Sequence, residues 1–436
     1  MQRRSIIKSG ALAGAGLMVS GFDAWSKMPV KIAEGKRYKF INGKIITPYR
    51  IIPDGCLCID KGKISELSEQ DVPFPDAEII DAQGNYISPG FIDIHTHGAG
   101  GSDFMDGTAE AYLQVAKKHA QHGTTGLYPT TLASANEELF HTFETYRRAK
   151  AQNTQGASFL GIHLEGPYFS MNQRGAQDPK YIRNPHPDHY MAILDATDDI
   201  ARWSAAPELE GSKAFAETLV ARGILPAIAH SDATYEEVVS SAFDWGFSHV
   251  THLYSATSTV VRRSGFRYAG IIEAAYLTDG MTVEIIADGV HLPASLLQLI
   301  YKIKGPEKIA LITDSMRAAG MPEGKSILGS LTNGQEVIVE DGVAKLPDRT
   351  AFAGSVATAG RLVRTMLQLA GTALPETIQM ATITPARIMG IDKSKGSLAK
   401  GKDADIVIFD KDIHVKMTMV NGKIVYHDMK SCTINV

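Results

Sequence analysis

The hydrophobic pattern divides the chain into a long middle and two shorter ends. Between about residues 89 and 390, short apolar runs that suit buried strands alternate with stretches of helical periodicity, such as 109–121, 236–245 and 294–302. Eight strands that alternate with helices predict a parallel sheet closed into a (β/α)8 barrel. The candidate strands are residues 90–94, 126–129, 159–163, 203–206, 225–229, 249–252, 283–287 and 309–313.

An open, doubly wound sheet is the alternative arrangement of the same elements. That fold binds dinucleotides through a Gly-x-Gly-x-x-Gly turn after a strand, and no such turn follows any of the eight candidate strands. The alternation breaks at about residues 328–353, where a hairpin-like pattern over 337–343 predicts a β insertion. We therefore expect residues 89–390 to form a barrel that carries this insertion.

Both ends of the chain have the pattern of β structure. An Asn-Gly hairpin turn at Asn42 joins two apolar runs, and residues 404–410 form a buried-strand pattern that precedes a second Asn-Gly turn at Asn421. Two β-rich ends around a long middle predict one small sandwich built from residues 37–88 and 391–436.

Composition adds limits on partners and location. The 436 residues are 44% hydrophobic and 21% charged, which is typical of a soluble protein of two or three domains. A net charge of -4 without a long basic run argues against a nucleic-acid partner, and no segment is long enough for a membrane span. Arg3 and Arg4 before a short apolar run resemble a twin-arginine export signal over residues 1–26, which predicts a periplasmic protein. A cytoplasmic protein with an unstructured basic N terminus is the alternative.

Imidazole and carboxylate side chains recur at the ends of the predicted strands. The carboxyl ends of barrel strands converge on one mouth, and the spacing of His95 and His97 turns both side chains to one face. Each residue alone has a commoner structural explanation, such as a buried polar histidine or a helix cap. Recurrence at several strand ends favours a divalent metal, and zinc accepts this mixture of ligands. The set is His95, His97, Glu165, His230 and His252, with Asp288, His291 and Asp314 after the last two strands.

These segments resemble the N-acetylglucosamine-6-phosphate deacetylase family of the amidohydrolase superfamily. The resemblance rests on PGFIDIHTHG at 89–98, HLEGPY at 163–168, AHSDAT at 229–234, THLY at 251–254 and DGVH at 288–291. It extends from about residue 37 to the C terminus. The His-Leu-Glu-Gly-Pro and Thr-His-Leu motifs together set this branch apart from amidohydrolases that use a carboxylated lysine.

The resemblance implies a metal site with one or two ions in each subunit. Glu165, His230 and His252 match the main metal ligands of the family. His95 and His97 match a second pair that only some members possess. A divalent metal such as zinc is therefore the expected cofactor.

The resemblance also implies the catalytic and substrate-binding residues. Asp314 matches the general base and acid, and His291 matches the residue that contacts the sugar and polarises the amide. Arg263 falls where the family places a phosphate-binding arginine supplied across a dimer interface, which implies a homodimer. Other substrate-contacting positions are matched by Ala176, Ser255, Ala256 and Phe352.

Two positions depart from the family pattern. Ser255 stands where many members have asparagine, and Gln177 stands where some have a phosphate-contacting histidine. We expect a deacetylase that releases acetate from N-acetylglucosamine 6-phosphate or a related N-acetylated amino sugar. An N-acyl-amino-acid or cyclic-amide hydrolase would use the same ions and the same Asp314. A non-enzymatic sugar-binding relic is disfavoured because every ligand position is present.

Overall fold

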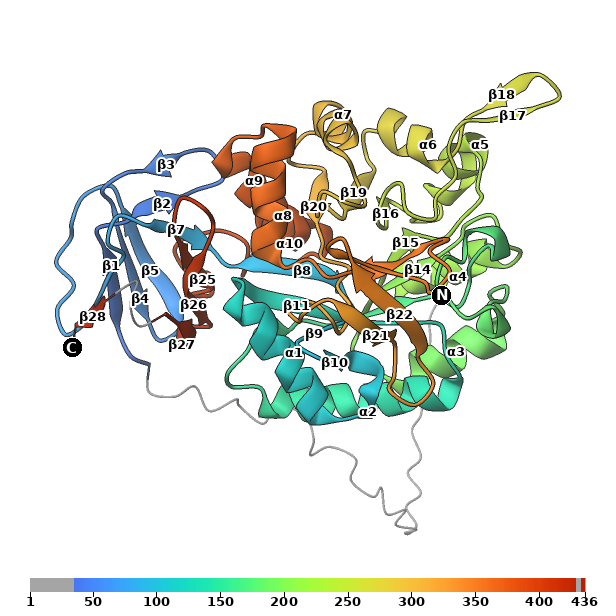
Figure 1. The fold of residues 1–436 in the computed structure, drawn as a ribbon. Coiled ribbons are helices and arrows are strands. Elements are labelled where there is room, and N and C mark those ends of the chain that lie inside the picture. The colour runs from blue at the N-terminus through green and yellow to red at the C-terminus, as the bar shows by residue number, and fades with distance from the viewer. Residues whose placement is uncertain (1–34, 429–432, 436) are drawn as a thin grey trace, which may run out of the picture. The chain divides into compact units, whose positions relative to one another are not determined.

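The computed structural model describes residues 35–428 and 433–435 (Figure 1). Gly35–Val436 forms one compact unit. The expected twin-arginine signal over residues 1–26 lies outside the described residues. Within the described part of the chain, no helix is both long and apolar enough to cross a membrane.

Eight parallel strands form the barrel, and they follow one another in chain order. Each strand pairs with the next from the first to the eighth, and a bridge between Thr96 and Ser315 links the first strand to the segment after the eighth. The predicted (β/α)8 barrel is therefore confirmed. The strands are β8 (Phe91–Thr96), β11 (Thr124–Thr131), β13 (Ile162–Glu165), β14 (Ile200–Ala205), β15 (Leu225–Ile228), β16 (His249–Val250), β19 (Thr282–Ile285) and β20 (Ile309–Leu311).

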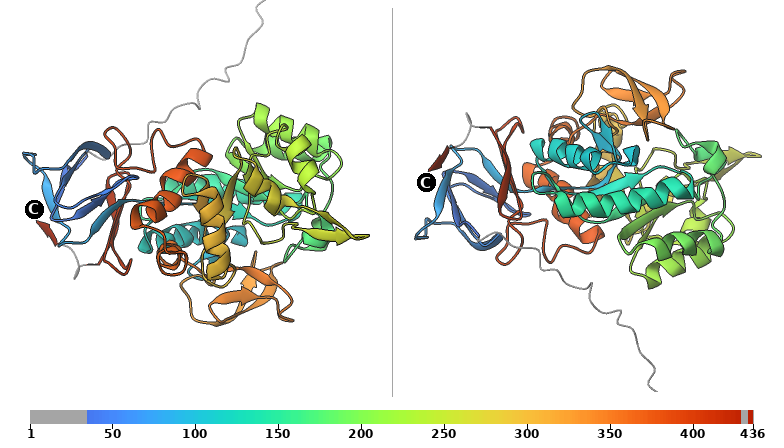
Figure 2. Two further views of the ribbon diagram at one scale, coloured as in Figure 1. Left: turned by 90° about the horizontal axis from the view of Figure 1, so that it is seen from above. Right: turned by 90° about the horizontal axis from the view of Figure 1, so that it is seen from below.

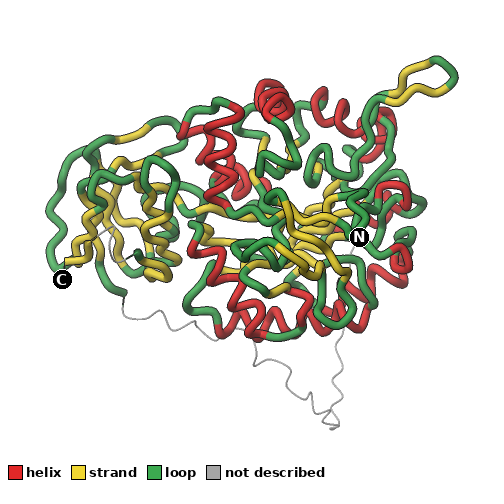
Figure 3. Tube along the Cα trace, in the orientation of Figure 1, coloured by secondary structure: helices red, strands yellow, loops and turns green. Residues whose placement is uncertain are grey.

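Helices surround the barrel strands, as Figure 2 and Figure 3 show. Helix α1 (Ala109–Gln121) begins where the Thr108 side chain accepts a hydrogen bond from the backbone of Ala111, and it buries Tyr112 and Val115 against the barrel. The segment predicted as a helix over 236–245 is instead one turn, α5 (Tyr235–Glu237), followed by a π-helical turn. Other helices are α2 (Asn136–Gln152), α3 (Pro187–Ala196), α4 (Ser212–Ala221), α6 (Ile271–Leu277), α7 (Ala294–Lys304), α8 (Ala359–Thr365), α9 (Leu374–Ala381) and α10 (Ile383–Ile388).

The two chain ends form the expected β-sandwich. One sheet combines β1 (Tyr38–Ile41), β4 (Cys56–Asp60), β5 (Lys63–Ser68), β6 (Glu78–Asp81) and β28 (Thr433–Asn435). The other combines β2 (Lys44–Ile46), β3 (Ile51–Ile52), β7 (Tyr86–Pro89), β25 (Ile406–Phe409), β26 (Val415–Val420) and β27 (Lys423–His427). The sheets enclose a hydrophobic core of their own that includes Phe40, Leu57 and Ile406. Because each sheet contains strands from both ends, the sandwich ties the termini of the described unit together.

Two additions to the barrel matter for the site. The first is an antiparallel sheet of β21 (Gly324–Leu328), β22 (Gln335–Glu340), β23 (Val343–Lys345) and β24 (Phe352–Ser355). A bridge between Ser315 and Ser355 joins this sheet to the barrel mouth. The second is a projecting hairpin of β17 (Val261–Arg263) and β18 (Phe266–Tyr268), whose six residues are all exposed (Figure 1).

Candidate active site

The ends of five barrel strands bring the expected metal ligands and the expected base Asp314 to one mouth. His95 lies in β8, and Glu165 is the last residue of β13. His230, His252 and Asp314 come soon after β15, β16 and β20 and have positive φ angles of 47°, 29° and 46°. Such angles are uncommon outside glycine and cluster at functional sites. These turns direct three side chains inward at the point where the strands end.

Glu165 lies at the centre of the cluster. Its Oε1 atom is 3.0 Å from Nε2 of His252, 3.3 Å from Nε2 of His230 and 3.5 Å from Nε2 of His95. Its Oε2 atom is 3.4 Å from Nε2 of His97. Thus four imidazole rings direct the same nitrogen atom toward one carboxylate.

Asp314 lies on the side of the cluster formed by the His-Thr-His segment. Its Oδ1 atom is 3.4 Å from Nε2 of His95 and 3.3 Å from Nε2 of His97. Burial opposes ionisation of Asp314, but the charge of His95 and the hydrogen bond from His97 lower its pKa below the usual value. The carboxyl group is therefore held as a carboxylate within reach of both rings.

Fixed partners orient the rings of three ligands. The Nδ1 atom of His230 donates to the backbone oxygen of Gln173 at 2.8 Å, and that of His252 donates to the backbone oxygen of Ser255 at 3.1 Å. Nδ1 of His95 lies 3.2 Å from the Glu284 carboxylate. Because these oxygens only accept, Nδ1 of each ring carries a proton, and Nε2 is the ring nitrogen that faces the cluster.

The donor set fits a divalent cation. Ligand atoms of His95, His97 and Asp314 lie within 4.8 Å of one another, and so do those of His95, Glu165 and His252. Nε2 of His95 is buried without a hydrogen-bond partner among the described residues. An imidazole nitrogen left in this state beside carboxylates suits a metal ion. The two overlapping groups have room for one or two ions.

The charge balance of the cluster also favours a cation. Burial lowers the pKa of His97, but the hydrogen bond to Asp314 and the charge of Glu165 outweigh it and raise the pKa to about 9. Burial likewise opposes the ionised form of Glu165, yet His95 and the hydrogen bonds from His230 and His252 hold its pKa well below the usual range. The cluster therefore attracts positive charge into a buried site.

A buried ion pair lies behind the expected metal ligands, inside the barrel. Glu284 and Arg202 are both fully buried and form an ion pair. Glu284 also accepts from His95 and from the backbone of His252, and Arg202 donates to Thr251 at 2.6 Å. This network ties the orientation of His95 to the packing of three strands, β14, β16 and β19.

The structure places Gln177 against the histidine and carboxylate cluster. Its Nε2 atom donates to Oε2 of Glu165 at 2.9 Å, and its Oε1 atom accepts from the backbone of Ala133 at 2.9 Å. Both ends of this amide are therefore in use within the chain. In some family members a phosphate-contacting histidine is expected at this position, whereas here the Gln177 side chain orients Glu165.

A cavity of about 320 Å³ lies over the cluster. This size lies within the range of small-molecule sites, roughly 300–1,000 Å³. Its lining includes His97, Glu165, His230, His252 and Asp314 together with the expected substrate-contacting residues Ala176, Ser255, Ala256, His291 and Phe352. His291 donates from Nδ1 to Asp288 at 2.8 Å, which leaves Nε2 as its second nitrogen.

Among the expected substrate-contacting residues, Arg263 is the one that does not line this cavity. It lies on the exposed β17–β18 hairpin, with its guanidinium 5.6 Å from the ring centre of Tyr268. No lysine or arginine among the described residues lines the cavity. Any cation that meets a phosphate there must come from elsewhere.

Sequence reasoning missed Glu284, Arg202 and the orienting role of Gln177. Glu284 lies in the otherwise apolar run 283–287, and a lone carboxylate in a buried strand is a usable signal because buried charges need partners. Nothing in the sequence indicates which partner each of these residues meets.

Comparison with known proteins agrees with this geometry. The model of the amidohydrolase family matches residues 86–425, which include every expected ligand. The barrel and its cluster therefore define an amidohydrolase.

Two curated relatives cover most of the chain. The N-acetylglucosamine-6-phosphate deacetylase of Bacillus subtilis is 33% identical over 387 residues, which are 88% of this chain and 95% of the relative. The Haemophilus influenzae protein of the same name is 32% identical over 393 residues, which are 89% of this chain and 99% of the relative.

Solved structures give the same result. The N-acetylglucosamine-6-phosphate deacetylase of Pasteurella multocida matches with a TM-score of 0.81 and 32% identity, over 89% of this chain and 99% of its own. A variant of the Mycobacterium smegmatis enzyme, solved in complex with N-acetyl-D-glucosamine-6-phosphate, matches with a TM-score of 0.81 and 29% identity, over 90% and 99%. The chain belongs to the N-acetylglucosamine-6-phosphate deacetylase family of the amidohydrolases, as the resemblance predicts.

Proposed function

We propose that this protein is a metal-dependent deacetylase that hydrolyses N-acetylglucosamine 6-phosphate to acetate and glucosamine 6-phosphate. The observation that carries the proposal is the convergence of four imidazoles and two carboxylates beneath a cavity of about 320 Å³. The relatives that share the family bear this activity in their names. The same site also fits other N-acetylated amino sugars.

We assign the metal as zinc, in one or two ions. Glu165, His230 and His252 would hold one ion, and His95 with His97 would hold a second where two bind. Zinc accepts imidazole and carboxylate ligands and leaves a position open in catalytic sites. A bound ion supplies Lewis acidity, which lowers the pKa of water at the site to about 7 and polarises a carbonyl oxygen.

Asp314 acts as the base and then as the acid. As a carboxylate beside His95 and His97, it accepts a proton from the water that attacks the acetamido carbonyl. It then delivers that proton to the departing amine nitrogen, and acetate and the amino sugar leave. One residue can serve both steps because the proton it gains in the first is lost in the second.

His291 stabilises the negative charge that develops on the carbonyl oxygen. Because Nδ1 of His291 donates to Asp288, Nε2 is the ring nitrogen that His291 can offer to the carbonyl oxygen. A preorganised donor of this kind contributes about 2.7–4 kcal/mol to catalysis.

A 6-phosphate needs a cation, and no lysine or arginine among the described residues lines the cavity over the cluster. The hairpin that carries Arg263 projects from the barrel and exposes Phe266, whose side chain is 71% exposed. A homodimer that inserts this hairpin into its partner would cover Phe266 and bring Arg263 to the phosphate of the substrate bound in the partner.

Export of the protein by a twin-arginine signal over residues 1–26 is a separate proposal. Fractionation of cells that express the full chain tests it.

The direct test compares two sugars. Zinc-loaded enzyme is assayed for acetate release from N-acetylglucosamine 6-phosphate and from N-acetylglucosamine. The proposal predicts that the phosphorylated sugar is preferred by at least about tenfold in kcat/KM, the size of one lost charged hydrogen bond. Equal kcat/KM for the two sugars would show that the enzyme does not require the 6-phosphate. Release of no acetate from either sugar would refute the deacetylase function.

A further inference from the structure

A second cavity opens beside the one over the metal cluster. Its volume is about 530 Å³, against about 320 Å³ for the first. A monosaccharide over the cluster leaves this larger space empty, and a longer molecule can reach it. The residues that line both cavities are Leu132, Gly175, Ala176, Gln177, Leu328 and Ala351.

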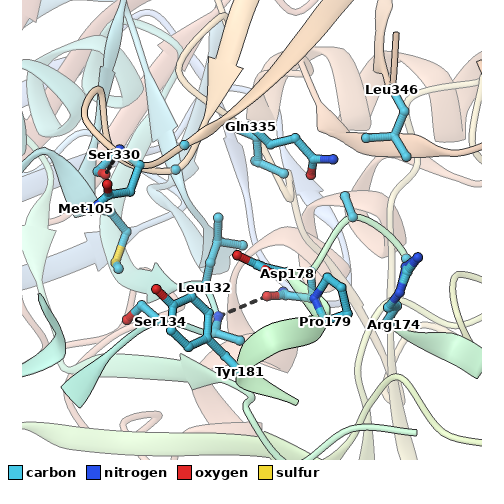
Figure 4. Close-up of a pocket in the computed structure, with 18 of the residues that line it drawn as sticks. Met105, Leu132, Ser134, Arg174, Asp178, Pro179, Tyr181, Ser330, Gln335 and Leu346 are labelled. Atoms are coloured by element: carbon cyan, nitrogen blue, oxygen red, sulfur yellow. Dashed lines mark hydrogen bonds between the residues drawn. The ribbon is translucent and has the colours of Figure 1, made fainter. Parts of the chain in front are cut away.

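The second cavity lies between the barrel and the β21–β24 sheet (Figure 4). The loop after β13 contributes Arg174, Asp178 and Tyr181. The inserted sheet and its turns contribute Gln335 and Leu346. The insertion that interrupts the barrel pattern is thus what creates this space.

The position of Arg174 is fixed relative to the metal ligands. One residue before it, the backbone oxygen of Gln173 accepts from His230 at 2.8 Å. Three residues after it, the side chain of Gln177 donates to Glu165 at 2.9 Å. A group held by Arg174 is therefore held at a defined place relative to the catalytic cluster.

Two polar side chains in the second cavity have no side-chain partner among the described residues. The half-buried Arg174 guanidinium and the Gln335 amide form no side-chain hydrogen bond or ion pair with any residue in the described ranges. A guanidinium offers five donors, and an amide offers both donors and an acceptor. These groups are free to bind a ligand.

The rest of the lining identifies the chemistry of that ligand. Carboxylates of Glu138, Asp178 and Asp348 outnumber the one arginine, so a second phosphate would meet net negative charge. The hydroxyl groups of a sugar ligand can donate to these carboxylates and accept from Arg174. The aliphatic side chains beside them suit the C–H faces of a sugar ring. The apolar part comes from Met105, Leu132, Leu328 and Leu346.

We propose that the second cavity binds an uncharged sugar unit joined by a glycosidic bond to the N-acetylated sugar. The enzyme then deacetylates a phosphorylated disaccharide, and the hydrolysis itself is unchanged: water adds, the amide C–N bond breaks, and acetate leaves the free amine. This inference rests on the proposed deacetylase function. It extends the substrate class from monosaccharides to glycosides.

The experiment measures kcat/KM of the zinc-loaded enzyme for acetate release from N-acetylglucosamine 6-phosphate and from two isomers of N,N′-diacetylchitobiose 6-phosphate. One isomer has the phosphate on the reducing ring and the other on the non-reducing ring, so the second sugar is attached through C4 or C1. We expect kcat/KM for at least one isomer to equal or exceed that for the monosaccharide.

Variants then locate the second sugar. We expect Arg174→Met to lower the ratio of disaccharide to monosaccharide kcat/KM about tenfold, and Gln335→Ala to lower it about threefold. Arg148→Met is the matched control, since Arg148 lies exposed on α2 outside this cavity, and its ratio should equal that of the wild type.

Two results overturn the inference in different ways. If the monosaccharide is deacetylated but neither disaccharide is, or if Arg174→Met and Gln335→Ala leave the ratio at the wild-type value, the second cavity is not a sugar subsite and the proposed function stands. If no compound releases acetate, the proposed function fails and the inference falls with it.

Discussion

The four histidines of the cluster differ in what holds their second ring nitrogen. Backbone oxygens hold His230 and His252, whereas a carboxylate, Glu284, holds His95. Glu284 is itself a buried charge that depends on Arg202. Removing one member of such a pair leaves the other charge buried without compensation, which costs about 3–5 kcal/mol.

The first prediction concerns this ion pair. Glu284→Gln keeps the shape of the side chain but leaves Arg202 unpaired, so we expect the free energy of unfolding of the metal-free protein to fall by about 3–5 kcal/mol. Denaturant unfolding measures the change. Glu336→Gln is the control, because Glu336 pairs with Lys325 on the surface and its loss should cost at most about 1 kcal/mol. Equal stability of the two variants would show that the buried pair does not support the barrel.

Single residues also show where sequence reasoning ends. His95 and Glu165 could be recognised because each lies in a motif at a strand end. The contact between His95 and Glu284 joins residues 189 positions apart, and only the closed barrel brings them together. The role of Gln177 could not be predicted for the same reason. A glutamine can serve several roles, and only its contact with Glu165 in the folded chain shows which one it has.

Among the elements, the barrel strands and the β insertion of β21–β24 could be predicted, whereas the β17–β18 hairpin and the π-helical turn could not. Buried parallel strands form continuous apolar runs, which are recognised from a single sequence. The hairpin of β17 and β18 has neither an alternating pattern nor a core to pack on, because all six strand residues are exposed. The π-helical turn after α5 also has no periodic signature that distinguishes it from the helix predicted over 236–245.

The second prediction concerns the hairpin. Phe266→Ser removes an exposed apolar side chain from the proposed dimer contact, so we expect sedimentation velocity to show a shift from dimer toward monomer. Loss of the partner's Arg263 should also lower kcat/KM for N-acetylglucosamine 6-phosphate about tenfold or more. Leu277→Ser is the control, because Leu277 is 70% exposed but lies on α6, and it should change neither measurement. A wild-type monomer with full activity would contradict the dimer.

At the scale of the whole molecule, the metal cluster connects most of the chain. The expected metal ligands come from strand ends spread between residues 95 and 252, so an ion that binds them would stabilise the closed barrel. The sandwich adds a second link, since Val407 of β25 packs into the barrel core and Thr418 of β26 donates to the backbone of α1 at 2.7 Å. We therefore expect metal binding and global folding to be coupled.

The third prediction follows from the pKa of His97. In the metal-free protein this pKa is raised from 6.5 to about 9, so the folded state binds a proton that the unfolded state has lost. The contribution of this proton to the free energy of unfolding is complete below about pH 6.5 and is lost as the pH rises through about 9. The total change is about 3 kcal/mol. Thermal unfolding of the metal-free protein at pH 6 and pH 9.5 measures it, with His97→Asn as the variant that lacks this contribution. An identical pH dependence in wild type and variant would contradict the assignment.

The central claim is that the histidine and glutamate ligands hold the metal while Asp314 moves the proton. The most direct test measures zinc content and acetate release from N-acetylglucosamine 6-phosphate on the same samples of wild type and Asp314→Asn. We expect the variant to keep nearly all of its zinc and to lose at least about a hundredfold in kcat, the lower range for a general acid–base residue. Substantial loss of zinc would make Asp314 chiefly a ligand, and an unchanged kcat would contradict the mechanism.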